Sequence, residues 1–203
     1  MEALIIGWRK AWEVGDFPFY YVQLAPFNYG YLIDDEESDI LDFYRLPLIW
    51  EAQRNALKIP NTGMAVTTDI SNLYDIHPKN KKDVGYRLSL WAMAKTYGQK
   101  GLVYSGPLYQ AMSVEGNKIR IQFDHVGSGL ISLDGHPLSW FTIAGSDRTF
   151  YKARAEISRD SVLIWSERVN EPVAVRFGWH QLATPNLGNK EGLPASPFRT
   201  DRW

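Results

Sequence analysis

An acid and an imidazole two residues apart lie in a short polar connection of the chain. Asp75 and His77 fall within residues 72–85, after an apolar run at 63–66. On an extended backbone, residues i and i+2 point the same way, so the Asp75 carboxylate can reach one ring nitrogen of His77. Pro78 favours extended geometry at His77. An orienting acid and a histidine that titrates near neutral pH are two members of a hydrolase triad. The spacing therefore makes Asp75 and His77 candidates for the acid and the base of such a triad.

The same residues also admit a structural interpretation. Asp75 and His77 would then be surface residues of a loop that enters a helix, with Asp83 as the N-cap. Asp-x-His is a short and common pattern, so the spacing alone favours the structural interpretation. Asp69, which follows the predicted buried strand 64–68, is a second candidate for the orienting acid.

The residues around this pair resemble the sialate O-acetylesterase family. The matching blocks are Asp75 to Lys81, Asp83 to Gly85, Arg87-Leu88, Ala94 to Gly98, Asp16 to Pro26, Arg54 to Leu57, Val103 to Pro107, Asn186-Leu187 and Gly192 to Arg199. The resemblance implies an SGNH-type serine esterase that removes acetyl groups from sugars, with a partial SGNH, flavodoxin-like α/β layer. It also implies that His77 is the catalytic base and that Asp75, rather than Asp69, is the orienting acid. The implied substrate is an acetylated sugar or glycan. Relatives of this type also act on acetylated plant polysaccharides, so the sugar stays open.

The family's nucleophile block, of Gly-Gln-Ser-Asn type, has no counterpart in the sequence. A Gly-x-Ser-x-Gly motif is also missing. We therefore expect the chain to be the C-terminal portion of a longer enzyme, inactive as a fragment, whose partner is a missing N-terminal half carrying the nucleophilic serine. The family likeness also implies a secreted or periplasmic protein.

Composition and charge narrow the possible functions. The 203 residues are 45% hydrophobic and 22% charged, which is an ordinary globular composition. The net charge of −1, with both signs interspersed, argues against nucleic acid as a partner. Cysteine is absent, which excludes disulfides, and the four histidines lack ligand spacing, so we expect no metal or cofactor. The N-terminal apolar run is too short to span a membrane.

The first 100 residues predict an α/β layer. Helices are expected at 1–14, 46–57 and 84–97, and buried parallel strands at 17–24 and 64–68. In the first helix, a buried stripe is expected from the spacing of Leu4, Ile5, Trp8, Ala11 and Trp12. Gln23 is a candidate substrate-binding residue, because ligands in open α/β sheets collect beyond the carboxyl ends of strands. The alternative is a polar strand end that meets solvent. Two strands alone are too few to bury both faces of a sheet, so we expect further strands of this layer to be missing from the sequence. The acidic run 34–37 is expected in a solvated surface loop.

Residues 101–203 predict a second domain, an antiparallel β-sandwich. Short, partly alternating runs recur at 111–114, 118–123, 141–144, 150–157, 161–165 and 174–179, separated by turn residues. The boundary is expected near 99–101. An extended tail, 185–203, follows, and the family likeness implies that it packs back onto the catalytic domain.

The aromatic residues leave a further alternative open. Aromatic residues make up 14% of the chain, which has eight tryptophans, and sugar-binding proteins use such rings as flat platforms, although a core can also use them. A non-catalytic carbohydrate-binding module is therefore the alternative function. His125, His136 and His180 are interpreted as surface or hydrogen-bonded loop imidazoles.

Overall fold

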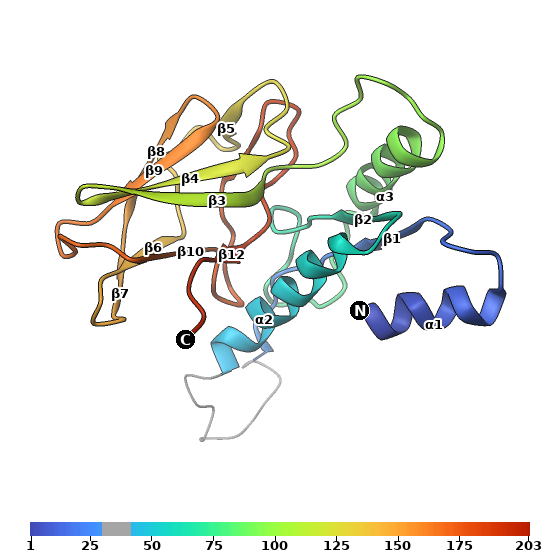
Figure 1. Cartoon of the computed structure of the whole chain (residues 1–203), viewed down its shortest axis with the longest axis horizontal. Helices are drawn as coiled ribbons and strands as arrows, with labels where there is room; N and C mark the ends of the chain where they lie inside the picture. The colour runs from blue at the N-terminus through green and yellow to red at the C-terminus, as the bar shows by residue number, and fades with distance from the viewer. Residues whose placement is uncertain (30–41) are drawn as a thin grey trace.

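The computed structural model describes residues 1–29 and 42–203 (Figure 1). The acidic run 34–37 lies outside the described residues. The first elements are α1 (Glu2–Trp12), β1 (Phe19–Val22), α2 (Asp42–Asn55), the 3-10 turn η2 (Ala56–Lys58), β2 (Thr62–Ala65), α3 (Lys81–Trp91) and the π-helical turn η3 (Ala92–Thr96). The predicted alternation of helices and strands is therefore present, with shifted boundaries.

The two predicted strands pair in parallel, with Phe19 opposite Thr62. Helices cover both faces of this small sheet, α3 on one side and α1 with α2 on the other (Figure 1). Gly63 is required on the α3 side, because a Cβ there would lie 2.5 Å from the Trp91 ring. On the opposite side, Tyr21 and Met64 pack in a buried cluster with Ile5 of α1. The apolar character of both strand faces follows from this double cover.

A glutamine from α2 closes part of the outer edge of β1. The Gln53 side chain donates to the Val22 carbonyl at 2.9 Å and accepts from the Leu24 amide at 3.0 Å. A neighbouring parallel strand would bond the same two backbone groups. The indole of Trp50 adds a hydrogen bond to the Leu24 carbonyl at 2.6 Å. These contacts fix the carboxyl end of β1 against α2.

Three local predictions for the helices are corrected by the structure. The cap of α3 is Asn80 rather than Asp83: the Asn80 side chain accepts from the Asp83 amide at 3.1 Å. Helix α2 starts before residue 46 and carries Pro47 within it. The apolar residues of α1 do not form a buried stripe, because Ile5 is buried whereas Trp8 and Trp12 are about half exposed.

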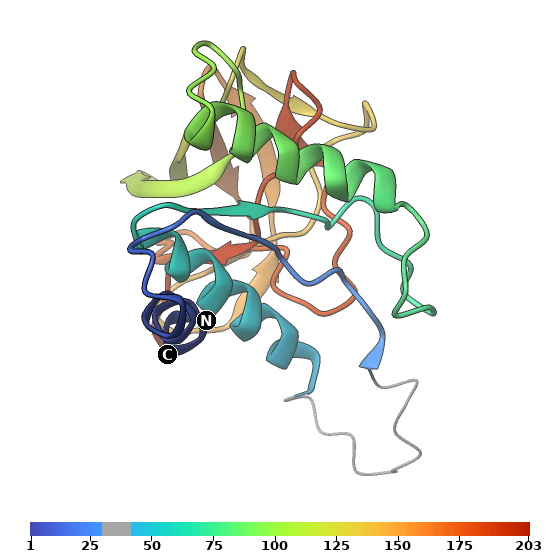
Figure 2. The same ribbon diagram turned by 90° about the vertical axis from the view of Figure 1, so that its right-hand side faces the viewer.

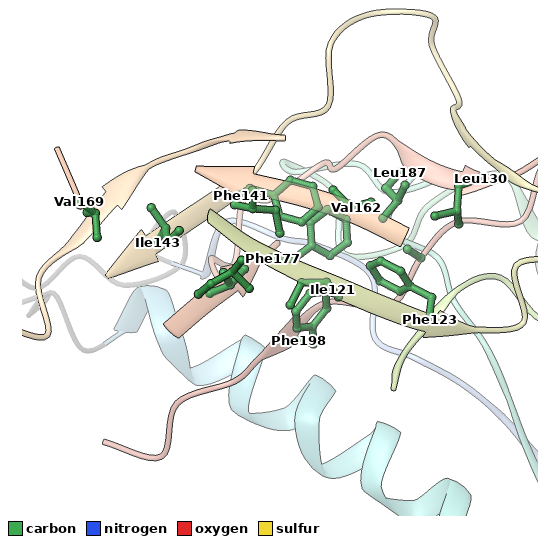
Figure 3. Packing of buried hydrophobic residues seen from close by; sticks show 14 residues of the cluster. Ile121, Phe123, Leu130, Phe141, Ile143, Val162, Val169, Phe177, Leu187 and Phe198 are labelled. Carbon is green, nitrogen blue, oxygen red and sulfur yellow. The ribbon is translucent and has the colours of Figure 1, made fainter. Parts of the chain in front are cut away.

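The C-terminal half consists of short antiparallel strands. They are β3 (Leu108–Glu115), β4 (Lys118–Asp124), β5 (Leu130–Ser132), β6 (Phe141–Ala144), β7 (Phe150–Lys152), β8 (Arg154–Ser158), β9 (Ser161–Trp165), β10 (Ala174–Phe177), β11 (Leu187–Asn189) and β12 (Phe198–Arg199). Two sheets of four strands form, in the orders β3-β4-β9-β8 and β12-β10-β6-β7. Alternate residues of both sheets meet in one apolar core, which includes Ile121, Val162, Phe141, Phe177 and Phe198 (Figure 3). The antiparallel sheets are as predicted, whereas the boundary near 99–101 stays a prediction.

The C-terminal tail joins the two halves. It contributes β11, which pairs with β5, and β12, which pairs with β10. Arg199 of β12 forms two hydrogen bonds with the Glu51 carboxylate of α2, at 2.9 and 3.1 Å. Gly106 lies so close to the Pro194 carbonyl that no Cβ fits between them. The prediction that the tail packs back onto the α/β part is confirmed by these contacts.

Within the described ranges 1–29 and 42–203, the helices are too short or too polar to cross a bilayer.

Candidate active site

The loop that follows β2 carries the predicted catalytic residues, and its first part is firmly held. The Thr67 hydroxyl donates to the Gln23 carbonyl at 2.8 Å, which ties the ends of the two parallel strands together. The backbone of Asn28, beyond β1, donates to the Leu73 carbonyl at 2.9 Å. In Figure 2 this loop, the N-terminal end of α2 and the chain leaving β1 all lie on the right-hand side of the molecule. The expected site therefore lies at the carboxyl edge of the parallel strands, where α/β folds place their ligands.

Asp69, the second candidate for the orienting acid, is engaged by an arginine. Both carboxylate oxygens accept from the Arg87 guanidinium at 2.6 Å, and Arg87 also donates to the Val66 carbonyl at 2.7 Å. Arg87 is buried, whereas 24% of the Asp69 side chain is exposed. A histidine would have to displace the arginine to use this carboxylate. The geometry gives Asp69 a structural role, holding the start of the loop against α3.

Asp75 and His77 lie side by side, as their spacing predicts. The His77 backbone amide donates to Asp75 Oδ1 at 2.9 Å, so a local turn holds the acid. The same oxygen lies 3.7 Å from His77 Nδ1. That separation exceeds a hydrogen bond, and the His77 side chain is 86% exposed. The two side chains are therefore close enough to form a catalytic dyad, but the hydrogen bond between the carboxylate and the imidazole is not made.

Gln23 is fully buried. Its amide nitrogen donates to the Ser196 hydroxyl at 3.0 Å, and the same hydroxyl lies 3.4 Å from its amide oxygen. Gln23 thereby links the end of β1 to the C-terminal tail. Its proposed contact with substrate stays a prediction.

The other histidines have distinct surroundings. His125 has φ +61° and packs among Trp91 and Tyr104, with ring centroids 6.3 and 5.1 Å away. Burial lowers its pKa, and Lys95 acts in the same direction while Asp124 opposes them. His125 thus lies in the loop after β4, as expected, but it is half-buried against aromatic rings rather than on the open surface. His136 is in a turn, as expected.

The turn at His136 is organised by Asp134. Hydrogen bonds from the Asn186 amide, the His136 backbone and the Ser132 hydroxyl lower the pKa of Asp134 to about 2. Asn186 belongs to one of the blocks that carry the family resemblance, and its side-chain amide nitrogen contacts four oxygens of this turn. The geometry gives Asn186 a structural role.

No serine hydroxyl hydrogen-bonds to an imidazole ring in the described part of the chain, and no group of three or more potential metal ligands occurs there. Ser105 is buried and donates to the Gly106 carbonyl at 2.9 Å.

Sequence patterns did not reveal two buried polar groups near the strand ends. Thr68 Oγ1 and Gln181 Nε2 are buried without a hydrogen-bond partner among the described residues. Thr68 follows β2, and the Gln181 carbonyl accepts from the Phe27 amide at 3.2 Å. Buried polar groups are usually paired, so unpaired ones call for an explanation. The one sequence signal was the polar end of the predicted strand 64–68.

Comparison with known proteins confirms the resemblance. The sialate O-acetylesterase of Rattus norvegicus is 37% identical over 123 residues, which cover 52% of this chain and 21% of the rat protein. The Homo sapiens sialate O-acetylesterase is 35% identical over 132 residues, covering 57% of this chain and 24% of the human protein. No family model matches the chain.

A solved structure covers nearly the whole chain. The crystal structure of a carbohydrate acetylesterase from Xanthomonas citri is 43% identical, with a TM-score of 0.90, over 99% of this chain and 45% of the solved one. The chain thus spans less than half of that protein and under a quarter of the curated relatives. The mixed α/β fold of this chain, with its antiparallel sheets, therefore matches the fold of part of a carbohydrate acetylesterase.

Proposed function

We propose that this chain provides the base and the acid of a carbohydrate O-acetylesterase that works through a Ser-His-Asp mechanism. The observation that carries the proposal is the agreement in fold and sequence with the Xanthomonas citri carbohydrate acetylesterase along almost the whole chain. The adjacency of Asp75 and His77 at the carboxyl edge of the parallel strands supports it chemically.

In the proposed reaction, a serine outside these 203 residues attacks the carbonyl carbon of the sugar acetyl ester. His77 accepts the hydroxyl proton and passes it to the departing sugar oxygen, leaving an acetyl-serine. His77 then takes a proton from water, whose oxygen attacks the acetyl carbonyl carbon. The bond between the serine oxygen and the acetyl group breaks, acetate leaves, and His77 returns the proton to the serine oxygen. Asp75 orients the imidazole and stabilises its charged form throughout.

The geometry around His77 gives this mechanism a structural requirement. The 3.7 Å between Nδ1 and Oδ1 must shorten to hydrogen-bond length, and water must be excluded from a ring that is 86% exposed. Catalytic hydrogen bonds often tighten only when substrate binds. We propose that the polypeptide carrying the serine covers His77 and supplies the oxyanion donors, which in such sites lower the barrier by about 3–4 kcal/mol.

The substrate we propose is an O-acetylated glycan, either a sialic acid or a plant polysaccharide. The names of the relatives support acetyl esters on sugars as a class.

The test combines this chain with the part of the Xanthomonas citri acetylesterase outside the matched 45%. Release of acetate from an O-acetylated sugar is measured for the parent, His77→Ala and Asp75→Asn. We expect His77→Ala to abolish turnover and Asp75→Asn to reduce it strongly, whereas His136→Ala serves as the matched control and keeps full activity. Retention of most activity in His77→Ala would remove His77 from the mechanism.

A further inference from the structure

Three aromatic rings from distant parts of the chain gather beside the carboxyl edge of the parallel strands. Phe43 in the first turn of α2 stacks on His180, with centroids 4.9 Å apart and planes at 17°. Trp140, just before β6, lies 5.9 Å from His180 at 32°. We call Phe43, Trp140 and His180 the aromatic shelf. Its members come from both halves of the molecule.

A proline inside α2 helps to hold the shelf in place. Pro47 has no amide hydrogen, so it cannot donate to the Phe43 carbonyl four residues earlier. The Gln181 amide donates to that carbonyl instead, at 2.9 Å. The residue next to His180 is thereby fixed to the residue on which His180 stacks. The sequence alone gives no reason for a proline at this point of the helix. The structure gives one, because Pro47 leaves the Phe43 carbonyl free to accept from Gln181.

Backbone hydrogen bonds connect the shelf to the loop of the proposed site. The Gln181 carbonyl accepts from Phe27, beyond β1, at 3.2 Å. The next residue, Asn28, bonds Leu73, two residues before Asp75. A short series of contacts therefore runs from the shelf to the loop that carries Asp75 and His77. Both lie on the same edge of the sheet.

Trp140 is held in an unusual conformation. Its φ is +63°, a region that bulky side chains rarely adopt, and its carbonyl accepts from the Gly178 amide at 2.9 Å. Despite its size, the side chain remains 38% exposed. Strained residues tend to occur where the conformation serves binding. Among residues 1–29 and 42–203, neither core packing nor a side-chain hydrogen bond accounts for this exposed ring.

His180 adds a polar group to the shelf. Its Nδ1 accepts from the Leu182 amide at 3.1 Å, so the proton of the neutral ring is on Nε2. Burial lowers the pKa of His180, which favours that neutral form. The shelf thus combines uncharged aromatic faces with one N–H donor. A sugar ring presents the complementary chemistry, an apolar C–H face surrounded by hydroxyl acceptors.

We propose that the aromatic shelf binds a neutral pyranose ring of an O-acetylated oligosaccharide, next to the sugar whose acetyl group is removed. This inference rests on the proposed function for the identity of the ligand. The shelf would select oligosaccharides over small acetyl esters, because a small ester does not reach it.

The binding test uses the full chain and calorimetric titration with a partly O-acetylated xylo-oligosaccharide, and with the same oligosaccharide after deacetylation. Trp140→Gly removes the ring and suits the positive φ, so the fold is expected to persist, as circular dichroism would verify. We expect this variant to bind both ligands roughly tenfold more weakly. Trp140→Phe should retain most of the affinity. Trp12→Ala is the matched control, since it removes a tryptophan that is 58% exposed on α1.

Unchanged affinity in Trp140→Gly, or no binding of either ligand by the parent chain, would overturn the proposal. The two proposals fail separately. If Trp140→Gly binds more weakly but the combined protein releases no acetate, the shelf stands and the esterase proposal fails. If the combined protein releases acetate from the oligosaccharide with the same KM in Trp140→Gly and parent, the shelf proposal fails and the esterase stands.

Discussion

Replacing Arg87 by methionine should destabilise the chain strongly. The substitution removes three hydrogen bonds, two to Asp69 and one to the buried Val66 carbonyl. Loss of one partner from a buried ion pair costs about 3–5 kcal/mol. Because 24% of Asp69 is exposed, water screens the remaining carboxylate, so we expect a loss of about 2–3 kcal/mol.

Two further variants separate the contributions to this loss. Asp69→Asn leaves Arg87 its bond to Val66 and one amide acceptor, so we expect a loss of about 1 kcal/mol. Arg120→Met is the matched control, because Arg120 also holds a carboxylate through two hydrogen bonds, those to Glu115 at 2.6 and 2.9 Å. That pair joins β4 to the end of β3 and is partly exposed on both sides, so solvent screening should make the loss much smaller.

Urea unfolding followed by far-ultraviolet circular dichroism gives the free energies, provided that the slope with denaturant is unchanged. Equal losses of stability in Arg87→Met and Arg120→Met would contradict a special contribution from the buried arginine. A free energy of unfolding for Arg87→Met within about 0.5 kcal/mol of the parent, the usual range for surface changes, would contradict it as well.

Three further predictions concern the nucleophile, pH and the tail. A fluorophosphonate probe should leave the intact mass of the chain unchanged, and a stoichiometric adduct would place an activated serine within these residues. Hydrogen bonds lower the pKa of Asp134 from 3.8 to about 2. Its contribution to stability is therefore present above pH 4 and is lost as the pH falls through 2. In urea titrations, Asp134→Asn should lose less stability than the parent when the pH is lowered from 5 to 2. Gly106→Ala should lower the thermal midpoint sharply, since the new methyl group collides with the Pro194 carbonyl, at a cost of about 3 kcal/mol or more; a midpoint within two degrees of the parent, or about 1 kcal/mol in a domain this size, would contradict it.

Sequence periodicity correctly predicted the strands that have the same apolar surroundings on both faces. The strands near Tyr21 and Met64 are apolar on both faces because helices cover both, and their parallel pairing was predicted from that pattern. The burial of α1 was not predicted correctly, since Trp8 and Trp12 are exposed in the described structure. A hydrophobic stripe indicates that a face can be buried, but not which element buries it.

Local sequence patterns could not predict the contacts between residues far apart in the chain. Asp75 and His77 are two residues apart, so their proximity follows from backbone geometry. The two hydrogen bonds from Arg87 to Asp69 join residues that are 18 apart in the sequence, and no spacing rule predicts them. The short strands β11 and β12 have sequences rich in glycine and proline around them, which predicted only an extended tail.

The tail has a consequence for how the protein acquires its structure during synthesis. Arg199 bonds Glu51, which lies 148 residues earlier in the chain, and Ser196 bonds Gln23, which lies 173 residues earlier. On the ribosome Gln23 and Glu51 emerge well before these partners are made. The helices and parallel strands therefore stay incompletely packed until residues 196–199 have emerged. Closing such distant contacts is slow, so the nascent chain exposes apolar surface for longer than the mature fold does.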